Sequence, residues 1–386
     1  MPPGAIQFLL PSLTTLRGGG IERASRALVE AVAAARPRAA LEVVLGREPA
    51  LEHPEVLSSV LRGRVRVTGA GSMPGRLGSA QLVARGLGTL LRRGDGPALV
   101  VCGHLHYAPL GHALAVATGA RLVLVAHGIE AWAIRSPLIA HALRRADRVL
   151  AVSSYTATQL LAVHGVTAAR VRVLANPVDT ERFRPGPPAA AVEAQLATLP
   201  HPRVLSVTRL DAREGYKGID EVLQGLARSR RAVSYVVVGE GTDRPRLEAL
   251  ARRLGVTTLF AGYVPEEQLA DYYRAADCFA LPSRGEGFGC VFVEALACGL
   301  PVVAGGVDGS VDALGGGRLG LLVNPLDPDE IARAITAHLD GESPPETRNA
   351  AWLHAQVEER FGVAAFTRRV AAILAELDPP TPPGRA

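Results

Sequence analysis

The sequence is poor in lysine, because a single lysine, Lys217, stands against 41 arginines in 386 residues. Apolar runs are short, and none reaches the roughly 18 residues that a membrane-spanning helix needs. The four cysteines lie in apolar segments without a Cys-x-x-Cys pair, which predicts reduced core thiols in a cytoplasmic protein. The first residues, Met-Pro-Pro-Gly-Ala-Ile-Gln-Phe, have no basic segment ahead of an apolar one. This argues against a secretory signal peptide.

Acidic residues are also scarce in the first half of the chain. Residues 1–185 contain 22 arginines and 11 acids, whereas the remainder contains 20 basic and 26 acidic residues, for a net charge of +5. A basic first half could attract an anionic acceptor, or hold the protein peripherally on the inner face of an anionic membrane. A solvated arginine-rich surface explains the same composition, and both interpretations stay open.

Short β-branched runs alternate with helical segments along the chain, which predicts an α/β protein of two Rossmann-like, doubly wound domains. We expect a first domain over residues 1–185, a Pro- and Ala-rich linker over 186–202 and a second domain over 203–345. Helices over 346–377 would pack back toward the first domain, and 378–386 would form a disordered tail. Ligands of such sheets bind at the carboxyl ends of the strands, so we expect the two domains to face a central cleft. The predicted strands lie near residues 5–10, 41–45, 98–102, 121–126, 148–152, 171–174, 203–207, 234–238, 258–261, 278–281, 301–304 and 320–323.

The segment from 283 to 301 combines a glycine loop with a short helix from about Gly289 to Cys298. That helix is apolar except for Glu294, and a buried carboxylate is costly without a polar partner. A second acid, Glu286, lies in the loop beside the helix start. The first N–H groups of the helix would form an anion site, and two flanking acids suit a ligand with phosphate between two polyhydroxyl groups, such as a nucleotide sugar. The backbone groups concerned belong to Gly287, Phe288, Gly289, Cys290 and Val291. The alternative for Glu294 is a buried salt bridge to an arginine.

Lys217 follows the strand that begins at residue 203 and opens the next helix. A compact ammonium fits a crowded phosphate site where a planar guanidinium does not. Arg209, at the end of the same strand, could add a bidentate contact to the same diphosphate. The alternative for Lys217 is a solvent-exposed surface lysine.

Two further motifs have more ordinary explanations. The loop Gly18–Gly20 follows the first strand, but consecutive glycines do not have the spacing of a dinucleotide-binding motif. It is either a phosphate loop or a tight strand–helix turn. Asp327-Pro328-Asp329 is best explained as the N-cap and first turn of a helix. We therefore predict no metal and no cofactor, with Arg209, Lys217 and the helix start supplying the positive charge.

Residues 203–331 closely resemble the C-terminal domain of the GT-B glycosyltransferases, in the large retaining family 4. The first half resembles the same family more loosely, so that the resemblance covers nearly the whole chain. The C-terminal stretches are Arg209 with Lys217-Gly218, Val236–Gly241, Gly262–Val264, Ala276-Asp277, Pro282-Ser283, Glu286 with Glu294, and Gly299–Ala304. Those of the first half are Gly18–Arg23, His127-Gly128, Ala146–Arg148 and Asn176–Asp179.

The resemblance implies a role for each matching position. Arg209 and Lys217 would neutralise the donor diphosphate, Glu294 would bind the ribose, and Glu286 would hold the donor sugar. His127 would lie beside the transferring sugar, and the implied catalytic residues are His127, Glu286, Arg209 and Lys217. The remaining implied contacts are Gly19 and Gly20 over the donor phosphate, Gly239 in the donor site, backbone groups near Val264 at the base edge, and His104, His106 and Trp132 on the acceptor side.

The implied activity is a retaining hexosyltransfer from a UDP- or GDP-linked sugar, GDP-mannose among them, to a hydroxyl acceptor. That acceptor would be a saccharide, a lipid-linked saccharide or a small molecule in bacterial polysaccharide, glycolipid or natural-product glycoside assembly, and no nucleic acid partner is expected. The alternatives are a GT-B nucleotide-sugar 2-epimerase and a catalytically silent sugar-nucleotide-binding protein. Around Gly306–Asp312 the sequence departs from the Gly-Gly-x-x-Glu pattern common in the family.

Overall fold

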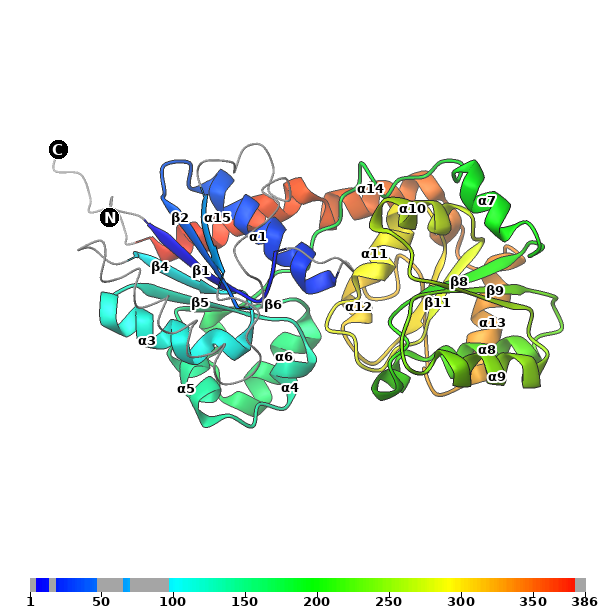
Figure 1. Ribbon diagram of the computed structural model, residues 1–386, viewed down its shortest axis with the longest axis horizontal. Coiled ribbons are helices and arrows are strands. Elements are labelled where there is room, and N and C mark those ends of the chain that lie inside the picture. The colour runs from blue at the N-terminus through cyan, green and yellow to red at the C-terminus, as the bar shows by residue number, and fades with distance from the viewer. Residues whose placement is uncertain (1–4, 14–18, 47–64, 70–96, 379–386) are drawn as a thin grey trace. The chain divides into compact units, whose positions relative to one another are not determined.

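The computed structural model describes residues 5–13, 19–46, 65–69 and 97–378. The chain forms two compact units. Unit 1 comprises residues 1–174 and 364–386, and unit 2 comprises residues 175–363. Each unit is a parallel sheet with helices on both faces (Figure 1), so the predicted fold class of two Rossmann-like domains is confirmed.

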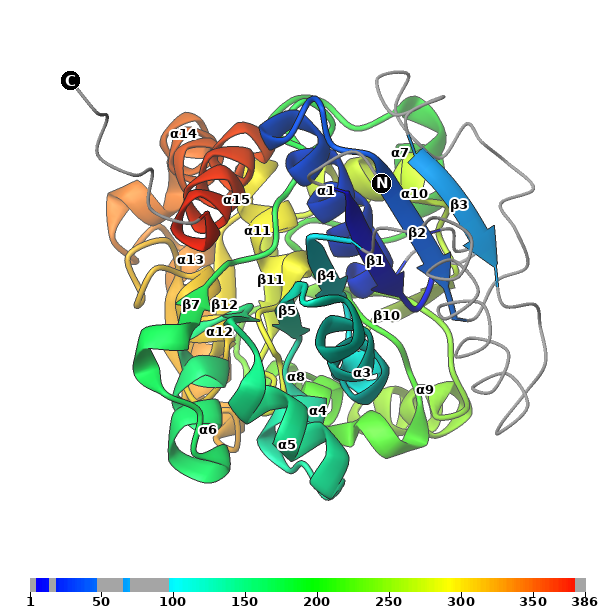
Figure 2. The same cartoon turned by 90° about the vertical axis from the view of Figure 1, so that its left-hand side faces the viewer.

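Unit 1 is built on a seven-stranded parallel sheet in the order β3-β2-β1-β4-β5-β6-β7. Its central strands are mostly apolar because both faces are covered, although β1 and β2 each bury one polar residue, Gln7 and Glu42. Figure 2 shows β3, β2, β1 and β4 side by side in this order. The strands are β1 (Ile6–Leu10), β2 (Leu41–Leu45), β3 (Val65–Gly69), β4 (Leu99–Cys102), β5 (Arg121–Ala126), β6 (Arg148–Ala151) and β7 (Val171–Val173).

Two helices from opposite ends of the chain cover one face of this sheet (Figure 1). They are α1 (Gly20–Ala35) and α15 (Val363–Leu377), and their apolar side chains share one core cluster with β1, β2 and β4. The other face is covered by α3 (Ala108–Thr118), α4 (Ile129–Trp132), α5 (Pro137–Arg145) and α6 (Ser154–His164). Unit 1 is therefore completed by residues that follow unit 2 in the sequence.

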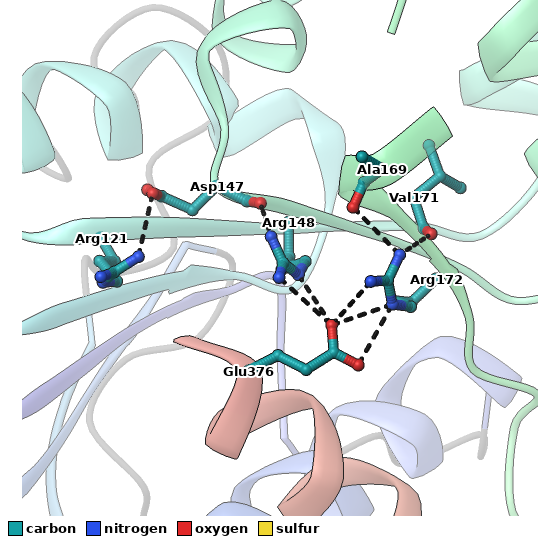
Figure 3. Close-up of polar contacts among 7 residues, drawn as sticks. All are labelled: Arg121, Asp147, Arg148, Ala169, Val171, Arg172 and Glu376. Atoms are coloured by element: carbon teal, nitrogen blue, oxygen red, sulfur yellow. Dashed lines mark hydrogen bonds and ion pairs between the residues drawn. The ribbon is translucent and has the colours of Figure 1, made fainter. Parts of the chain in front are cut away.

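A polar contact ties α15 to the sheet edge (Figure 3). The Glu376 carboxylate lies 3.2 Å from an Arg148 Nη and 2.8 Å from an Arg172 Nη. Arg172 also donates to the backbone oxygens of Ala169 and Val171. Arg148 is the first residue of β6, and Arg172 lies within β7. One carboxylate of α15 therefore bridges two neighbouring strands.

Unit 2 is a six-stranded parallel sheet in the order β10-β9-β8-β11-β12-β13. One face carries α8 (Ile219–Arg228), α9 (Arg244–Leu254) and α13 (Pro328–Leu339), and the other carries α10 (Glu266–Arg274), α11 (Cys290–Ala297), α12 (Ser310–Ala313) and α14 (Ala350–Phe361) (Figure 1). The strands are β8 (Arg203–Val207), β9 (Ser234–Val238), β10 (Thr258–Gly262), β11 (Cys278–Leu281), β12 (Val302–Gly305) and β13 (Leu321–Val323).

The division of the chain differs from the predicted one. The boundary follows Leu174 rather than residue 185, and the predicted linker contains the helix α7 (Ala190–Leu196) inside unit 2. The reason is Arg203, whose buried guanidinium donates to the carbonyls of Leu196 and Leu199. This contact anchors a segment whose Pro- and Ala-rich composition resembles a linker.

The C-terminal region also divides differently. Of the predicted 346–377 helices, α14 stays in unit 2, and only the residues from 364 onward join unit 1. The strand β3 was not predicted, and the rest of the predicted tail, residues 379–386, lies outside the described residues. Among the described residues, no helix is both long and apolar enough to cross a membrane. The cleft expected between the domains stays a prediction.

Candidate functional site

An ion pair lies at the carboxyl end of the unit 2 sheet. Lys217 Nζ donates to Glu286 Oε1 at 2.6 Å, and the two side chains are 14% and 13% exposed. The ammonium also lies 5.2 Å from the centre of the Tyr216 ring. Burial lowers the pKa of Lys217, but the charge and hydrogen bond of Glu286 together with Tyr216 and Glu214 outweigh it, so that the pKa lies above its ordinary value. Lys217 is therefore a cation at neutral pH and not a solvent-exposed surface lysine.

Arg209 has a different environment from Lys217. Its side chain is 77% exposed and pairs with Glu214. Gly239 brings the end of β9 against this loop, because a Cβ atom there would lie 1.8 Å from the Thr208 carbonyl oxygen. The guanidinium is thus displayed on the surface, where a ligand can compete for it at little cost.

The helix α11 starts where the sequence predicts. Gly289 precedes it with φ of 85°, a conformation that favours glycine. Phe288 is 2% exposed and its ring packs against Phe361, so only its backbone can serve a ligand. The first N–H groups of a helix have no partner inside it, which leaves this helix end suited to an anion.

Glu294 is buried in α11, being 3% exposed. Its Oε2 accepts a hydrogen bond from the hydroxyl of Tyr273 at 2.9 Å. Tyr273 comes from α10 and is fully buried. A polar partner of Glu294 is thus the Tyr273 hydroxyl, and the arginine considered as an alternative stays a prediction. Tyr273 is not among the residues predicted from the sequence, although a tyrosine on the apolar face of a helix signals a hydroxyl in need of a partner.

Three histidines gather at the ends of β4 and β5 in unit 1. The rings of His104 and His106 stack with centres 4.6 Å apart, and His104 lies 6.0 Å from His127. His127 Nε2 lies 2.7 Å from the carbonyl oxygen of Gly103. Because a carbonyl only accepts, Nε2 carries the proton. His127 Nδ1 is then an acceptor, and it is buried without a hydrogen-bond partner among the described residues.

The other residues predicted for unit 1 are engaged within that unit. The Trp132 indole donates to Thr156 Oγ1 at 3.2 Å, so its N–H is not free for an acceptor. Gly19 precedes α1, and the Glu22 carboxylate occupies the space beside it. Gly20 begins α1, and Gly18 lies outside the described residues.

The remaining predicted positions lie elsewhere in unit 2. The Gly239 N–H donates to the Gly262 carbonyl at 2.8 Å, and Val264 is 9% exposed. Cys290 Sγ accepts from the Asn176 amide. Asp327 caps α13 through the N–H groups of Asp329 and Glu330, which confirms the predicted N-cap. Within the described part of the chain, no group of three or more His, Cys, Asp or Glu side chains is arranged so that it could hold a metal ion.

Comparison with known proteins gives two family matches. A model described as "Glycosyl transferases group 1" matches residues 192–352, and one described as "Glycosyltransferase Family 4" matches residues 18–182.

Similar curated proteins include a "D-inositol 3-phosphate glycosyltransferase 2" of Catenulispora acidiphila. It is 38% identical over 209 residues, which cover 50% of this chain and 48% of that protein. Another is a "GDP-mannose-dependent alpha-(1-6)-phosphatidylinositol monomannoside mannosyltransferase" of Mycolicibacterium smegmatis, 35% identical over 56% of this chain and 60% of its own length. The matches thus span about half to three-fifths of these relatives.

Among solved structures, Anabaena Alr3699/HepE in complex with UDP and glucose superposes with a TM-score of 0.76 at 23% identity, over 97% of this chain and 100% of that one. Sucrose-phosphate synthase from Thermosynechococcus elongatus superposes with a TM-score of 0.78 at 23% identity, over 97% and 99% of the two chains. At this level of identity the likeness bears on the fold, which is shared over nearly the full chain.

Proposed function

The chain belongs to the family 4 glycosyltransferases of the GT-B fold, and from this membership we propose that it transfers a hexose from a nucleoside diphosphate sugar to a hydroxyl acceptor with retention of configuration. The observation that carries the proposal is the largely buried ion pair of Lys217, in the segment ahead of α8, and Glu286, in the loop ahead of α11. It puts one cation and one hydroxyl-binding carboxylate next to each other, as a phosphate bonded to a sugar requires.

In this proposal the two partners of the ion pair bind different parts of the donor: Lys217 binds the diphosphate and Glu286 binds the sugar. The diphosphate takes the Lys217 ammonium, the exposed Arg209 guanidinium and the N–H groups at the start of α11. Glu286 exchanges its ammonium partner for sugar hydroxyls, and Glu294 accepts from the ribose. These protein groups supply the positive charge, so the proposal involves no metal or other cofactor.

Unit 1 contributes the groups proposed for the transferred sugar and the acceptor. His127 Nδ1, as an acceptor, takes a hydrogen bond from a sugar hydroxyl, while His104 and His106 line the acceptor side. The acid beside His127 is Glu130, and its carboxylate accepts the His127 backbone N–H. We therefore assign no carboxylate nucleophile. The bond from the anomeric carbon to phosphate breaks as the acceptor oxygen bonds on the same face, and the acceptor proton passes to the departing phosphate.

The donor base is UDP or GDP in this proposal. The mannosyltransferase among the relatives is named for GDP-mannose and a phosphatidylinositol mannoside, and the Anabaena structure holds UDP and glucose. By analogy, the acceptor is a polyol, a saccharide or a lipid-linked saccharide in glycolipid, polysaccharide or glycoside assembly. The comparisons lend no support to an epimerase.

A membrane-bound acceptor fits the surface of α5 in unit 1. Leu138 is 66% exposed there, and Arg135, Arg144 and Arg145 are exposed around it. An exposed apolar side chain on a short helix that also carries exposed arginines suits an anionic membrane surface, and we propose peripheral contact on the inner face. Flotation with phosphatidylglycerol vesicles should carry the protein at low salt and lose it at high salt. Equal flotation with zwitterionic vesicles would contradict this contact.

The decisive experiment is binding followed by turnover. A thermal-shift screen with UDP, GDP and ADP, each with and without EDTA, should find one nucleotide that raises the melting temperature in both conditions. The matching nucleotide sugar should be consumed only when an acceptor is present, whereas an epimerase would convert it alone.

Lys217→Ala should lower turnover about 100-fold or more, while Asp329→Asn, on an exposed ion pair of α13, should not. Failure of all three nucleotides to bind, or loss of binding with EDTA, would refute the proposal.

A further inference from the structure

The turn between β12 and α12 contains a buried carboxylate that touches the loop of Glu286. Asp308 is 1% exposed and lies where the sequence departs from the common Gly-Gly-x-x-Glu pattern. Its Oδ2 accepts from the Glu286 N–H at 2.6 Å, and its Oδ1 accepts from the Ser310 N–H at 2.9 Å. One side chain therefore joins its own turn to the loop ahead of α11.

The same turn holds Glu286 from its other side. The Gly309 N–H donates to the Glu286 carbonyl oxygen at 2.9 Å, so both backbone polar groups of Glu286 are bound by residues 308 and 309. The approach is close, because a Cβ atom on Gly309 would lie 2.1 Å from the Gly287 carbonyl oxygen. The position of the Glu286 Cα atom is thus determined by this turn.

The side chain of Glu286 is held from the opposite direction. Its Oε1 accepts from Lys217 Nζ at 2.6 Å, and the Arg284 N–H donates to the Tyr216 carbonyl oxygen at 2.9 Å. The loop is thus bonded both to the Lys217 segment and to the Asp308 turn. Asp308 can influence Glu286 through the backbone without touching a ligand.

The chemistry of this contact requires a carboxylate. Burial raises the pKa of Asp308, and the hydrogen bonds from the Ser310 and Glu286 N–H groups oppose that shift. Both partners are donors, so the side chain must present two accepting oxygens. An asparagine has only one, and its NH₂ group would face a donor. Glycine would leave both N–H groups without this acceptor.

We propose that Asp308 is a positioning residue that sets the Glu286 carboxylate against the donor sugar. The inference rests on the proposed function and deepens it, because it separates sugar placement from nucleotide binding. The base and diphosphate contacts proposed above belong to other residues. Loss of Asp308 should therefore impair transfer while leaving the nucleoside diphosphate bound as before.

The test compares Asp308→Asn, Glu286→Gln and the double variant in the full-length protein. Calorimetry gives the Kd of whichever of UDP or GDP stabilises the wild type, and steady-state assays with its sugar give kcat/KM. Asp308→Asn should lower kcat/KM about tenfold or more and change the nucleotide Kd by less than about twofold. Because Asp308 acts through Glu286, the double variant should be no worse than Glu286→Gln alone. Asp308→Gly, which removes both accepting oxygens, provides the same test should the asparagine variant not fold.

Asp327→Asn is the matched control, because Asp327 also accepts from two backbone N–H groups but caps α13. It should lower the melting temperature without changing kcat/KM. Unchanged kcat/KM in Asp308→Asn, a parallel loss of nucleotide affinity, or a double-variant loss equal to the product of the single losses would overturn the positioning role. A wild type that binds no nucleoside diphosphate would overturn the proposed function itself, together with this inference.

Discussion

Glu294 lies in an otherwise apolar helix, and its contact with Tyr273 connects the core of unit 2 to the proposed donor site. The Tyr273 hydroxyl donates to Glu294 Oε2 at 2.9 Å. Tyr273→Phe removes this donor and leaves a buried carboxylate oxygen with one partner fewer, which should cost about 1–3 kcal/mol of stability. It should also weaken nucleotide binding, because Glu294 is the proposed ribose acceptor. Urea denaturation and calorimetry with UDP or GDP measure the two effects.

The neighbouring tyrosine provides the control for this prediction. The hydroxyl of Tyr272, on the same helix, donates to Gln195 Oε1 at 2.6 Å. Tyr272→Phe deletes the same atom at a distance from Glu294, and should lower stability without changing the nucleotide Kd. Equal loss of affinity in both variants would show that Glu294 has no special role.

His338 makes the stability of unit 2 depend on pH. The ring is 5% exposed, with Nε2 on the Val302 carbonyl and Nδ1 on the Ser343 hydroxyl. Burial lowers the pKa of His338 from 6.5 to about 4. A depressed histidine pKa means that the unfolded chain binds the proton first, so stability is complete above about pH 6.5 and falls as the pH drops toward about 4.

The gap between the two pKa values corresponds to at most about 3 kcal/mol. Urea denaturation from pH 7.5 to 4.5 should therefore show a steeper loss of stability for the wild type than for His338→Gln. Parallel pH profiles of the two proteins would contradict this assignment.

At the scale of the element, α15 is held to unit 1 by apolar packing and by Glu376 (Figure 3). Hydrogen bonds and charge from Arg172 and Arg148 lower the pKa of Glu376. A depressed carboxyl pKa stabilises the fold above the ordinary value of about 4.3, and this contribution is lost as the pH falls through the lower folded value. Because the side chain is 38% exposed, solvent screens the interaction.

Glu376→Gln should therefore cost no more than about 1 kcal/mol. At low salt, the amide hydrogens of α15 should exchange faster in Glu376→Gln than in the wild type. This difference should shrink in high salt. Glu359→Gln, an exposed residue of α14, is the control for the loss of one charge. A variant whose α15 exchanges like the wild type would show that the arginine contacts do not hold the helix.

Element prediction succeeded where local pattern decides and failed where a distant contact decides. The helix after Gly289 and the cap at Asp327 follow from backbone requirements of a few neighbouring residues. The segment 186–202 contains prolines and alanines that resemble a linker, yet Arg203 holds the end of α7 through the Leu196 carbonyl. The strand β3 pairs with β2 at the sheet edge, where no periodic apolar pattern is required.

At the scale of the whole molecule, unit 1 is discontinuous in sequence. Phe366, Val370 and Leu374 of α15 lie in the same core cluster as Leu28 and Val32 of α1. Burying each large apolar side chain contributes about 1.5–3 kcal/mol, and a domain's net stability is only about 5–15 kcal/mol. A chain that ends at residue 362 should therefore lose the fold of unit 1.

Unit 2 should survive this truncation, because its sheet and the proposed donor residues all precede residue 363. Limited proteolysis followed by mass spectrometry should find a resistant fragment near residues 175–362, and a nucleotide should still raise its melting temperature. Protease resistance of residues 1–174 equal to that of the full chain would contradict the prediction.

The sequence by itself determined the fold class and the chemical groups of the proposed donor site: one lysine among arginines, a glycine loop, and an acid in an apolar helix. These features depend on residue type and on spacing within a few turns of chain. Only the tertiary structure decided that the Tyr273 hydroxyl donates to Glu294, that Asp308 accepts from the Glu286 backbone, and that α15 completes unit 1. Such pairings join residues from different elements, and they form only when helices and strands with no local preference for one another are brought together by burial of their apolar faces.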